Sequence, residues 1–300
     1  MPNLQPSPIL IKEMRSTMRG KRTFIVITLF LIFLAGLNLL IYYTATQNMS
    51  IGSSSETGQM LFGFSSAIEL LLLVTITPPL TASAIASERQ QQTFDMLIAT
   101  PLTPRQILSG KLLASMNYLF LLIFASLPIN SIAFLFGGIT PSALLWWLGL
   151  TITVLLMLGC LGLLISTLVR SSGAATALTY IICMVVFVVL PISSTIMVSS
   201  LNQGNQFSTC FASSMWLLHP AGALGSIIVN QTDYDALALL PASLPLYGAL
   251  ASLCFLGAEA RLSSLSGPPW SRLLLAVALL LVIFIAAIYI IAIPVQEMCN

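Results

Sequence analysis

The sequence predicts an all-α protein that crosses a membrane several times. Hydrophobic residues make up 57% of the 300 residues and charged residues only 7%, which is too little polar surface to cover a water-soluble globule of this size. The chain also contains seven apolar runs, each about as long as the roughly 17 to 25 residues that a bilayer-spanning helix requires. Membrane lipid is therefore expected to be the main solvent of this chain.

The order of the apolar runs predicts the topology. The runs cover residues 24–43, 70–86, 112–136, 144–169, 174–198, 236–258 and 273–293. When they are threaded alternately through a membrane, all eleven Lys and Arg residues fall on one side. Because cytoplasmic loops carry the excess of basic residues, this side is expected to be cytoplasmic. We therefore expect a multi-pass protein of the inner or plasma membrane, with its N-terminus in the cytoplasm and its C-terminus outside.

The first 23 residues are expected to form a cytoplasmic amphipathic helix. Within residues 9–22, Leu10, Met14 and Met18 gather on one flank of a helix, and Lys12 and Arg15 lie on the other. This pattern is typical of a helix on the membrane surface, although an ordinary basic anchor flank would have the same location. The first apolar run is not followed by a small-residue cleavage site and is therefore expected to remain as a span.

The loop at residues 87–111 is the longest predicted cytoplasmic connection between spans. Residues 88–99 contain no Gly or Pro and are expected to be helical. Thr100 is followed by Pro101, which disfavours helix at the preceding residue. Thr103 then has the sequence of an N-cap, with Pro104 at the first helical position and Gln106 placed for a capping box. The sequence therefore predicts a rigid helix, break and helix elbow on which a partner can act.

The segment at residues 199–235 is the largest predicted exoplasmic connection. It contains apolar stretches at 215–218 and 221–229 that are too short to span a membrane, so they are expected to be re-entrant or interfacial helices. His219 is the only histidine of the chain and precedes Pro220; it is interpreted as a bystander rather than a catalyst. Cys210 and Cys299 are expected to face the outside, where a disulfide between them and two free thiols both remain possible.

Glycines and prolines punctuate the predicted spans. Pro78, Pro79 and four further prolines each remove a helical hydrogen bond and permit a kink. Gly159, Gly162 and Gly173 are expected to mark close helix contacts around the fourth and fifth spans.

The ionisable residues exclude several functional classes. None of the seven runs contains Asp, Glu, Lys, Arg or His, whereas ion-coupled transporters usually place such a group inside the bundle. Glu69 lies just before the second run and is open to two interpretations, an interfacial carboxylate or a substrate or ion site. A single histidine cannot supply a pair of zinc ligands, and its position in a loop does not suit a Ser–His dyad inside the bilayer. The small net charge of +2 and its position beside the spans also disfavour nucleic acid as a partner and favour membrane lipid.

An energy source within this chain is also not expected. Gly110 and Lys111 lack the upstream glycine of a phosphate-binding loop, so the chain is not expected to be an enzyme or to bind a cofactor. A bundle of bendable helices with a rigid cytoplasmic elbow is consistent with work supplied by a separate soluble ATPase, in which ATP and Mg would be bound.

Three segments resemble one known family. Residues 86–111 contain Glu-Arg at 88 and 89, a Thr at 93, a Leu at 97, Thr-Pro-Leu at 100–102 and Gly-Lys at 110 and 111, in the order found after the second span of ABC-2 type transporter permeases. Residues 8–15 are similar to the Pro-x-x-x-Lys-Glu-x-Arg pattern of the first helix of that family. Residues 219–224 resemble its Asn-Pro loop, with His219 in place of Asn.

The resemblance implies a function and a set of contact residues. It implies the membrane subunit of an ATP-binding cassette transporter, with a six-span core at 24–258 that forms a dimer with a second permease subunit. The loop at 87–111 of this core would dock onto a cytoplasmic ATPase. The contact positions carried over from the family are Glu88, Arg89, Thr93, Asp95, Leu97, Thr100, Pro101, Leu102 and Arg105, and those of the first helix are Lys12, Glu13 and Arg15. Glu69, His219 and Pro220 are the candidates for a translocation or exoplasmic role.

Three further features concern the C-terminal segment, the substrate and the class of the protein. The segment at 259–300 departs from the family core, because it adds a cytoplasmic linker and a seventh span at 273–293. The substrate is expected to be exported and to be amphipathic or lipid-linked. Two other classes stay possible, a non-transporting scaffold or signalling protein and a membrane enzyme with its site in 199–235.

Overall fold

The computed structural model describes residues 21–47, 54–94, 96, 102–137, 139–189, 192, 219–229 and 240–263, and all regular structure in these residues is helical. Six helical segments within them are long and apolar enough to cross a membrane. This result confirms the predicted fold class, an all-α polytopic membrane protein. The elements are α2 (Lys21–Gln47), α3 (Ser54–Thr81), α4 (Ser83–Gln90), α6 (Pro104–Ser131), α7 (Ala133–Phe136), α8 (Pro141–Leu168), α9 (Ser172–Met184), a π-helical segment (Val185–Val189), α12 (Pro220–Val229) and α14 (Leu240–Ser263).

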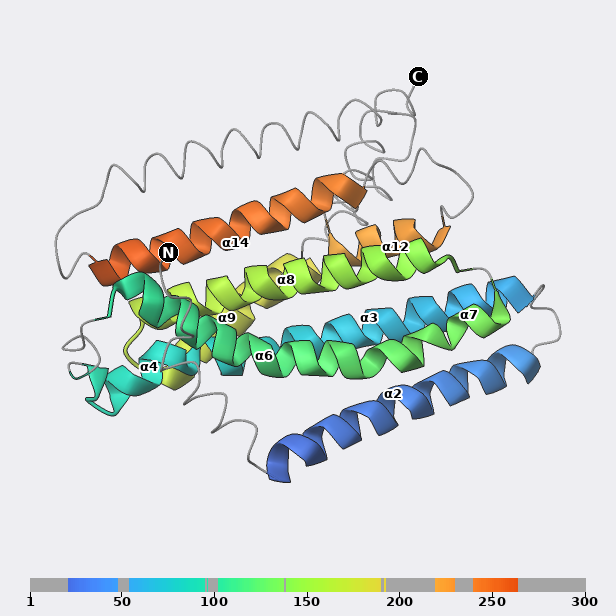
Figure 1. Cartoon of the computed structure of the whole chain (residues 1–300), viewed down its shortest axis with the longest axis horizontal. Coiled ribbons are helices and arrows are strands. Elements are labelled where there is room, and N and C mark those ends of the chain that lie inside the picture. Colours follow the sequence, from blue (N-terminus) through green and yellow to red (C-terminus); the bar gives the residue numbers. More distant parts are fainter. Residues whose placement is uncertain are drawn as a thin grey trace, which may run out of the picture.

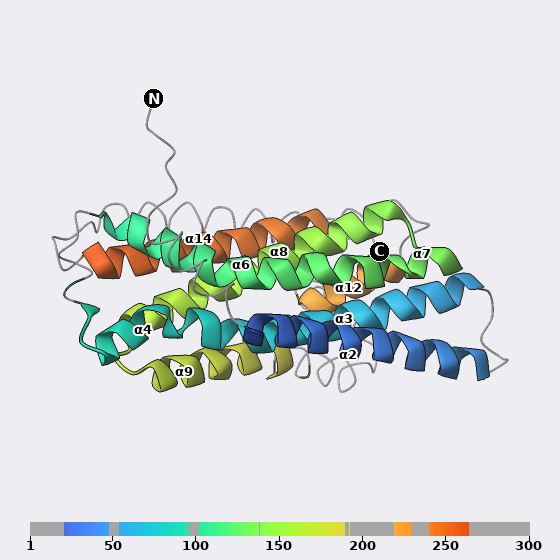
Figure 2. The same ribbon diagram turned by 60° about the horizontal axis from the view of Figure 1, so that its bottom comes forward.

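Helix α8 is the centre of the bundle. The long helices run side by side (Figures 1 and 2), and α8 contacts α3, α4, α6, α9, α12 and α14. Helix α8 has buried residues around its whole circumference, which is the pattern of a helix enclosed by others. Helix α2 contacts α3 and α6 and lies at the periphery. A central α8 explains why its sequence is among the most apolar of the chain.

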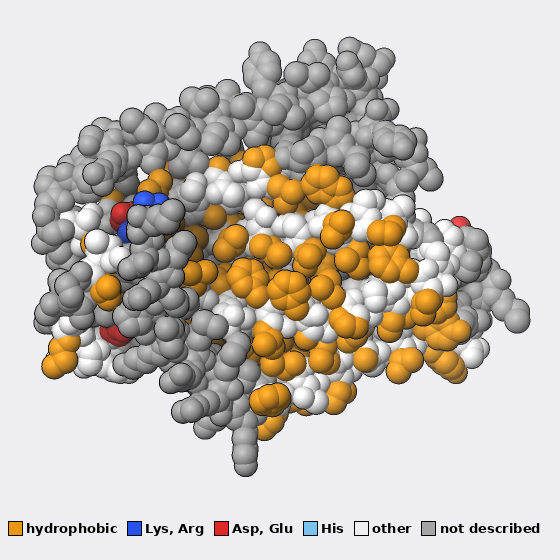
Figure 3. All heavy atoms as spheres, viewed as in Figure 1, with side chains coloured by type: hydrophobic (Ala, Val, Ile, Leu, Met, Phe, Trp, Pro, Cys, Tyr) orange, Lys and Arg blue, Asp and Glu red, His pale blue; other side chains and the backbone are white. Residues whose placement is uncertain are grey.

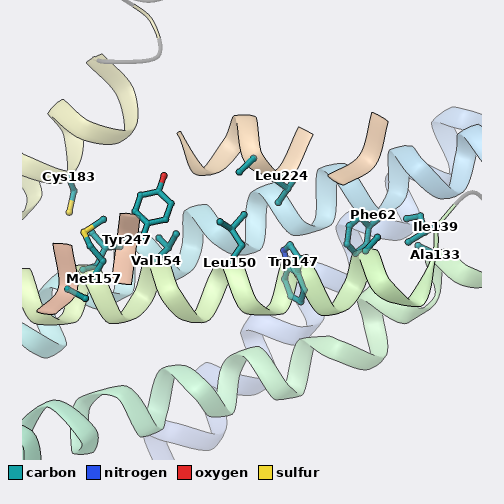
Figure 4. Close-up of a cluster of buried hydrophobic side chains, with 14 of the residues drawn as sticks. Phe62, Ala133, Ile139, Trp147, Leu150, Val154, Met157, Cys183, Leu224 and Tyr247 are labelled. Carbon is teal, nitrogen blue, oxygen red and sulfur yellow. The ribbon is translucent and has the colours of Figure 1, made fainter. Parts of the chain in front are cut away.

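The largest hydrophobic core forms on one side of α8 (Figure 4). Trp147 and Leu150 of α8 are fully buried there, and they lie near Phe62 of α3, Leu224 of α12 and Tyr247 of α14. The rings of Phe62 and Trp147 meet edge to face with centroids 6.2 Å apart, a favourable geometry for aromatic pairs. Helix α12 is thus packed into the bundle by Leu224, and it covers the stretch at 221–229 where the sequence predicted a short re-entrant or interfacial helix.

The outer surface is apolar along the helices and basic at one end. Leu29, Ile32 and Phe33 on α2 are more than half exposed, as expected for side chains that contact lipid. Figure 3 shows the visible Lys and Arg side chains at one end of the molecule. We call this the basic end; it carries α4, the start of α6, the end of α8 and the end of α14, with Arg89, Lys111, Arg170 and Arg261. The other end, where α3 and α8 begin, is called the opposite end.

The prediction for the second span is wrong at its N-terminal boundary. The second apolar run was expected to begin at residue 70, but α3 begins at Ser54. Residues 54–69 contain several Ser, Thr, Gly and Glu residues, which lower their hydropathy without preventing a helix. Ser66, for example, is buried and donates a hydrogen bond to the carbonyl oxygen of Phe62. Polar side chains that are satisfied within their own helix can lie inside a membrane bundle.

The other boundaries agree more closely with the predictions. Helix α8 begins three residues before the predicted run, because Thr140 caps it by accepting a hydrogen bond from the Ala143 amide and Pro141 takes the first helical position. The third span is interrupted at Ile132 between α6 and α7. The predicted seventh span at 273–293, the surface helix at 9–20, Cys210 and Cys299 lie outside the described residues.

Candidate functional site

The proline pair in α3 creates a polar contact between two spans. A proline at position 79 has no N–H to donate to the carbonyl of Thr75, four residues earlier. The Tyr180 hydroxyl of α9 donates to this carbonyl instead, at 2.6 Å. The helix continues through Pro78 and Pro79 to Thr81 and then turns at Ala82 into α4. Tyr180 therefore satisfies the carbonyl that Pro79 leaves without a backbone donor, and it connects α9 to this turn of α3.

Helix α4 is capped by a side chain from α8. Its N-cap residue, Ala82, has no side chain that can accept a hydrogen bond. The hydroxyl oxygen of Ser166 accepts from the amides of Ile85 and Ala86, at 2.8 and 2.9 Å. Capping of the first amides by an oxygen stabilises a helix start, so Ser166 fixes the direction in which α4 leaves the bundle.

Gly162 permits the close approach of α8 to the junction of α3 and α4. A Cβ atom at Gly162 would overlap the Thr81 hydroxyl and press on the Ala82 amide, and one at Gly159 would overlap the end of Met116. The predicted close contacts at Gly159 and Gly162 are therefore confirmed. The same prediction is wrong for Gly173, because a Cβ there would meet only Ser171 at the edge of van der Waals distance.

Helix α4 ends much earlier than the sequence predicts. It stops at Gln90, and the amides of Gln92 and Thr93 donate to the carbonyls of Arg89 and Glu88, at 3.2 and 3.0 Å. Gln92 has a φ of 60°, so this is a Schellman ending with glutamine in the left-handed position that glycine usually occupies. The prediction of one helix through 88–99 is wrong at 91–93, and the backbone is helical again at Phe94 and Met96.

A buried ion pair connects α4 to α6. The Lys111 ammonium donates to the Glu88 carboxylate at 2.7 Å and to the carbonyl of Ala84 at 2.9 Å. The side chain of Lys111 is 5% exposed and that of Glu88 is 26% exposed. We call these contacts, together with the Ser166 cap, the elbow brace. Separation of a buried ion pair leaves uncompensated charges, which costs free energy. The pair therefore stabilises the arrangement in which α4 lies against α6.

The return of the chain into α6 follows the prediction. The Gln106 amide donates to the Thr103 hydroxyl at 3.3 Å, and the Thr103 amide donates to the Gln106 side chain at 3.0 Å. This capping box, with Pro104 at the first helical position, was expected from the sequence. The capping box fixes the first turn of α6, which is the second helical arm of the elbow.

The predicted contact residues of the elbow differ in their exposure. Thr93 and Arg105 are exposed and Leu102 is half-buried. Arg89 is also half-buried, with its guanidinium 4.6 Å from the centroid of the Phe94 ring. Glu88 faces inward onto Lys111. Seven further contact residues lie outside the described residues or have side chains that are not described: Asp95, Leu97, Thr100, Pro101, Lys12, Glu13 and Arg15.

The structure overturns the predicted location of Glu69. It was expected at an exoplasmic interface before the second span, with no ionisable residue inside any span. Glu69 instead lies in the middle of α3 and is fully buried. Its carboxyl oxygens contact Ser126 and Asn130 of α6. The error arose at the N-terminal boundary of the predicted run, because the run was taken to begin directly after this acidic residue, at residue 70.

His219 and Pro220 together start α12. The Ala221 amide donates to His219 Nδ1 at 3.2 Å, and Pro220 is the first residue of the helix. The imidazole ring packs edge to face on Phe187, with centroids 5.7 Å apart. Burial lowers the pKa of His219 from its usual 6.5. Its contacts are those of a capping residue, and Asn is the residue that most often takes this role, which gives a physical reason for the substitution noted in the sequence.

Sequence reasoning missed three residues that hold these sites together. Lys111, Ser166 and Tyr180 each connect residues far apart in sequence. Lys111 was noted only as part of a Gly-Lys pair. Ser166 follows Gly162 by one helical turn, and a small polar residue beside a glycine on an apolar helix is a signal for a close polar contact.

These features define an integral membrane protein with a multi-helix bundle and a braced elbow at its basic end. A family model described as ABC-2 family transporter protein matches residues 7–292. The chain therefore belongs to the ABC-2 transporter family. A comparison with curated proteins finds no match.

Proposed function

We propose that this chain is the membrane subunit of an ABC exporter and that the elbow at 88–111 docks onto a separate cytoplasmic ATPase. The basic end is then the cytoplasmic end, in accordance with the positive-inside rule. A second permease subunit completes the translocation pathway, and the substrate is amphipathic or lipid-linked. ATP and Mg belong to the partner.

The observation that supports this proposal most directly is the elbow brace. A lever must be stiff and must be attached to the parts that it moves. The elbow is capped at both ends, by Ser166 at α4 and by Thr103 at α6, and the Glu88–Lys111 pair joins its two arms. It is continuous with α3 on one side and with α6 on the other, so a push on it reaches two spans at once.

Docking can be tested with a charge reversal on the exposed face of the elbow. Arg105 is exposed on the first turn of α6, and Arg105→Glu is expected to reduce co-purification of the ATPase and ATP-driven export without loss of membrane insertion. Glu56→Lys is the matched control, because Glu56 is exposed on the first turn of α3 at the opposite end. Equal loss in both variants, or loss in neither, would contradict the proposed docking surface.

A further inference from the structure

Glu69 lies near the middle of α3, which belongs to a helical segment long and apolar enough to cross a membrane. It is 15 residues from the start of α3 at Ser54 and 12 residues from its end at Thr81, which correspond to roughly 22 and 18 Å along the helix. The hydrocarbon core of a bilayer is about 30 Å thick. Glu69 is also fully buried inside the bundle, so neither water nor lipid headgroups reach it from these distances.

The partners of Glu69 are neutral. One carboxyl oxygen contacts the Ser126 hydroxyl, and the Asn130 amide nitrogen donates to the other at 2.7 Å. The Asn130 amide oxygen accepts from the Ser65 hydroxyl at 2.9 Å. Within the described residues no Lys, Arg or His contacts Glu69. A carboxylate without a cation in this environment would be costly.

The count of hydrogens favours the neutral acid. The Ser126 hydroxyl has one hydrogen and also lies 2.8 Å from the Ile123 carbonyl. If Glu69 carries a proton, its O–H donates to Ser126, and Ser126 donates to Ile123. Asn130 donates to the second carboxyl oxygen, and Ser65 donates to Asn130. The neutral acid thus gains one hydrogen bond over the carboxylate and buries no charge.

We propose that Glu69 is a neutral carboxylic acid that acts as a positioning residue and joins α3 to α6 near the middle of the membrane. We call the four residues Ser65, Glu69, Ser126 and Asn130 the midplane joint. Helices α3 and α6 are the two spans on either side of the elbow. A joint between them makes a displacement of the elbow move both spans as one body. This last step rests on the proposed function, whereas the protonation of Glu69 does not.

Two substitutions at Glu69 separate this role from that of an ionising group. In Glu69→Gln the amide can still donate to Ser126 and accept from Asn130, and no ionisable group remains. In Glu69→Leu both contacts are lost. Glu56→Gln is the matched control, since Glu56 is exposed. The purified full chain in lipid vesicles should show the infrared carbonyl band of a protonated carboxylic acid from mildly acidic to mildly alkaline pH. Glu69→Gln and Glu69→Leu should both abolish this band, and Glu56→Gln should keep it.

Transport provides the second readout. Glu69→Gln is expected to keep the unfolding temperature and the ATP-driven export of the wild type. Glu69→Leu is expected to lower export by roughly fivefold or more, the size of a typical coupling between sites, while the ATPase still co-purifies. If Glu69→Leu does not fold, Ser126→Ala removes only one contact and should lower export partially.

Two results would overturn the inference. Loss of export in a folded Glu69→Gln protein would mean that Glu69 must ionise, and wild-type export in Glu69→Leu would mean that the midplane joint is not used. Failure of the proposed function gives a different result, in which the wild-type chain binds no ATPase but the infrared band and the difference in unfolding temperature between the two variants persist.

Discussion

The two glutamates at positions 69 and 88 have opposite electrostatic roles in one continuous stretch of helix. Glu88, at the basic end, is paired with Lys111 at 2.7 Å, whereas Glu69, near the middle of α3, contacts only a hydroxyl and an amide. Both connect the α3–α4 segment to α6. The difference follows their exposure: the side chain of Glu88 is 26% exposed at the end of the bundle and is paired with a cation, whereas Glu69 is fully buried and its proposed neutral form needs none.

This comparison also separates two mechanical functions. The elbow brace fixes α4 to the start of α6, where force from a partner would arrive, and the midplane joint fixes α3 to α6 about 20 residues further along the path. A lever needs stiffness at both points. The variants below change the stiffness at one point and leave the other unchanged.

The largest effect is expected from loss of the cation in the elbow brace. Lys111→Met leaves the Glu88 carboxylate without its partner, and its second oxygen is already buried without a hydrogen bond. We expect a loss of roughly 3 kcal/mol in the free energy of unfolding, the low end for a broken buried pair, because Glu88 keeps partial exposure. Thermal unfolding of the purified protein measures it.

Two further variants serve as controls for that result. Arg105→Gln removes one positive charge from an exposed site on the same helix and should change stability little. The double variant Glu88→Gln with Lys111→Met should recover part of the loss, since no buried charge is left. No recovery in the double variant would show that the pair is not the stabilising contact.

The second largest effect is expected at the contact of α8 with the α3–α4 junction. Gly162→Ala places a methyl group against Thr81 and Ala82, and overpacking of this kind costs about 2 kcal/mol. The displaced α8 should also lose the Ser166 cap on α4. Gly149→Ala on the same helix is the matched control, because a Cβ there meets nothing within 4 Å. Similar unfolding temperatures for the two variants would contradict the close contact.

The elements that the sequence predicts best are those marked by local signals. The Thr103 capping box, the Thr140 and Pro141 start of α8 and the apolar core of each span all follow from residues within one or two helical turns. The predicted break at Thr100 and Pro101 lies outside the described residues. Local capping and hydropathy therefore suffice for the number of described spans and for the start of α6.

The features that were missed depend on contacts between helices. The end of α4 at Gln90 carries no glycine, and its left-handed residue is Gln92, so no local signal marks it. Glu69 lowered the hydropathy of its own helix and was placed outside it, because its partners Ser126 and Asn130 are about 60 residues away. A polar residue in a span can be interpreted only when its partner helix is known.

The smallest effect is expected at His219, where a neutral polar group is buried outside the spans. Because the pKa of His219 is lowered by burial, its neutral form stabilises the fold. That stability is present above the unfolded pKa of about 6.5 and is lost as the pH falls from there toward the folded value. Protonation of Nδ1 also removes the acceptor for the Ala221 amide. Thermal unfolding between pH 7.5 and 5.5 (roughly one unit either side of this value) should therefore show a decline in the wild type.

Two variants of His219 identify the source of the decline. His219→Asn retains an N-cap acceptor without an ionisable group, so its stability should not decline across this pH range. His219→Ala should lose about 1 kcal/mol at the higher pH, the usual cost of a lost cap, and should also show no decline. If His219→Asn keeps the pH dependence of the wild type, another group causes this dependence. The capping role of His219 would then be tested only by the stability of His219→Ala. A complete loss of export in His219→Ala with normal folding would instead favour a site in the segment at 199–235, since a cap acts only through stability.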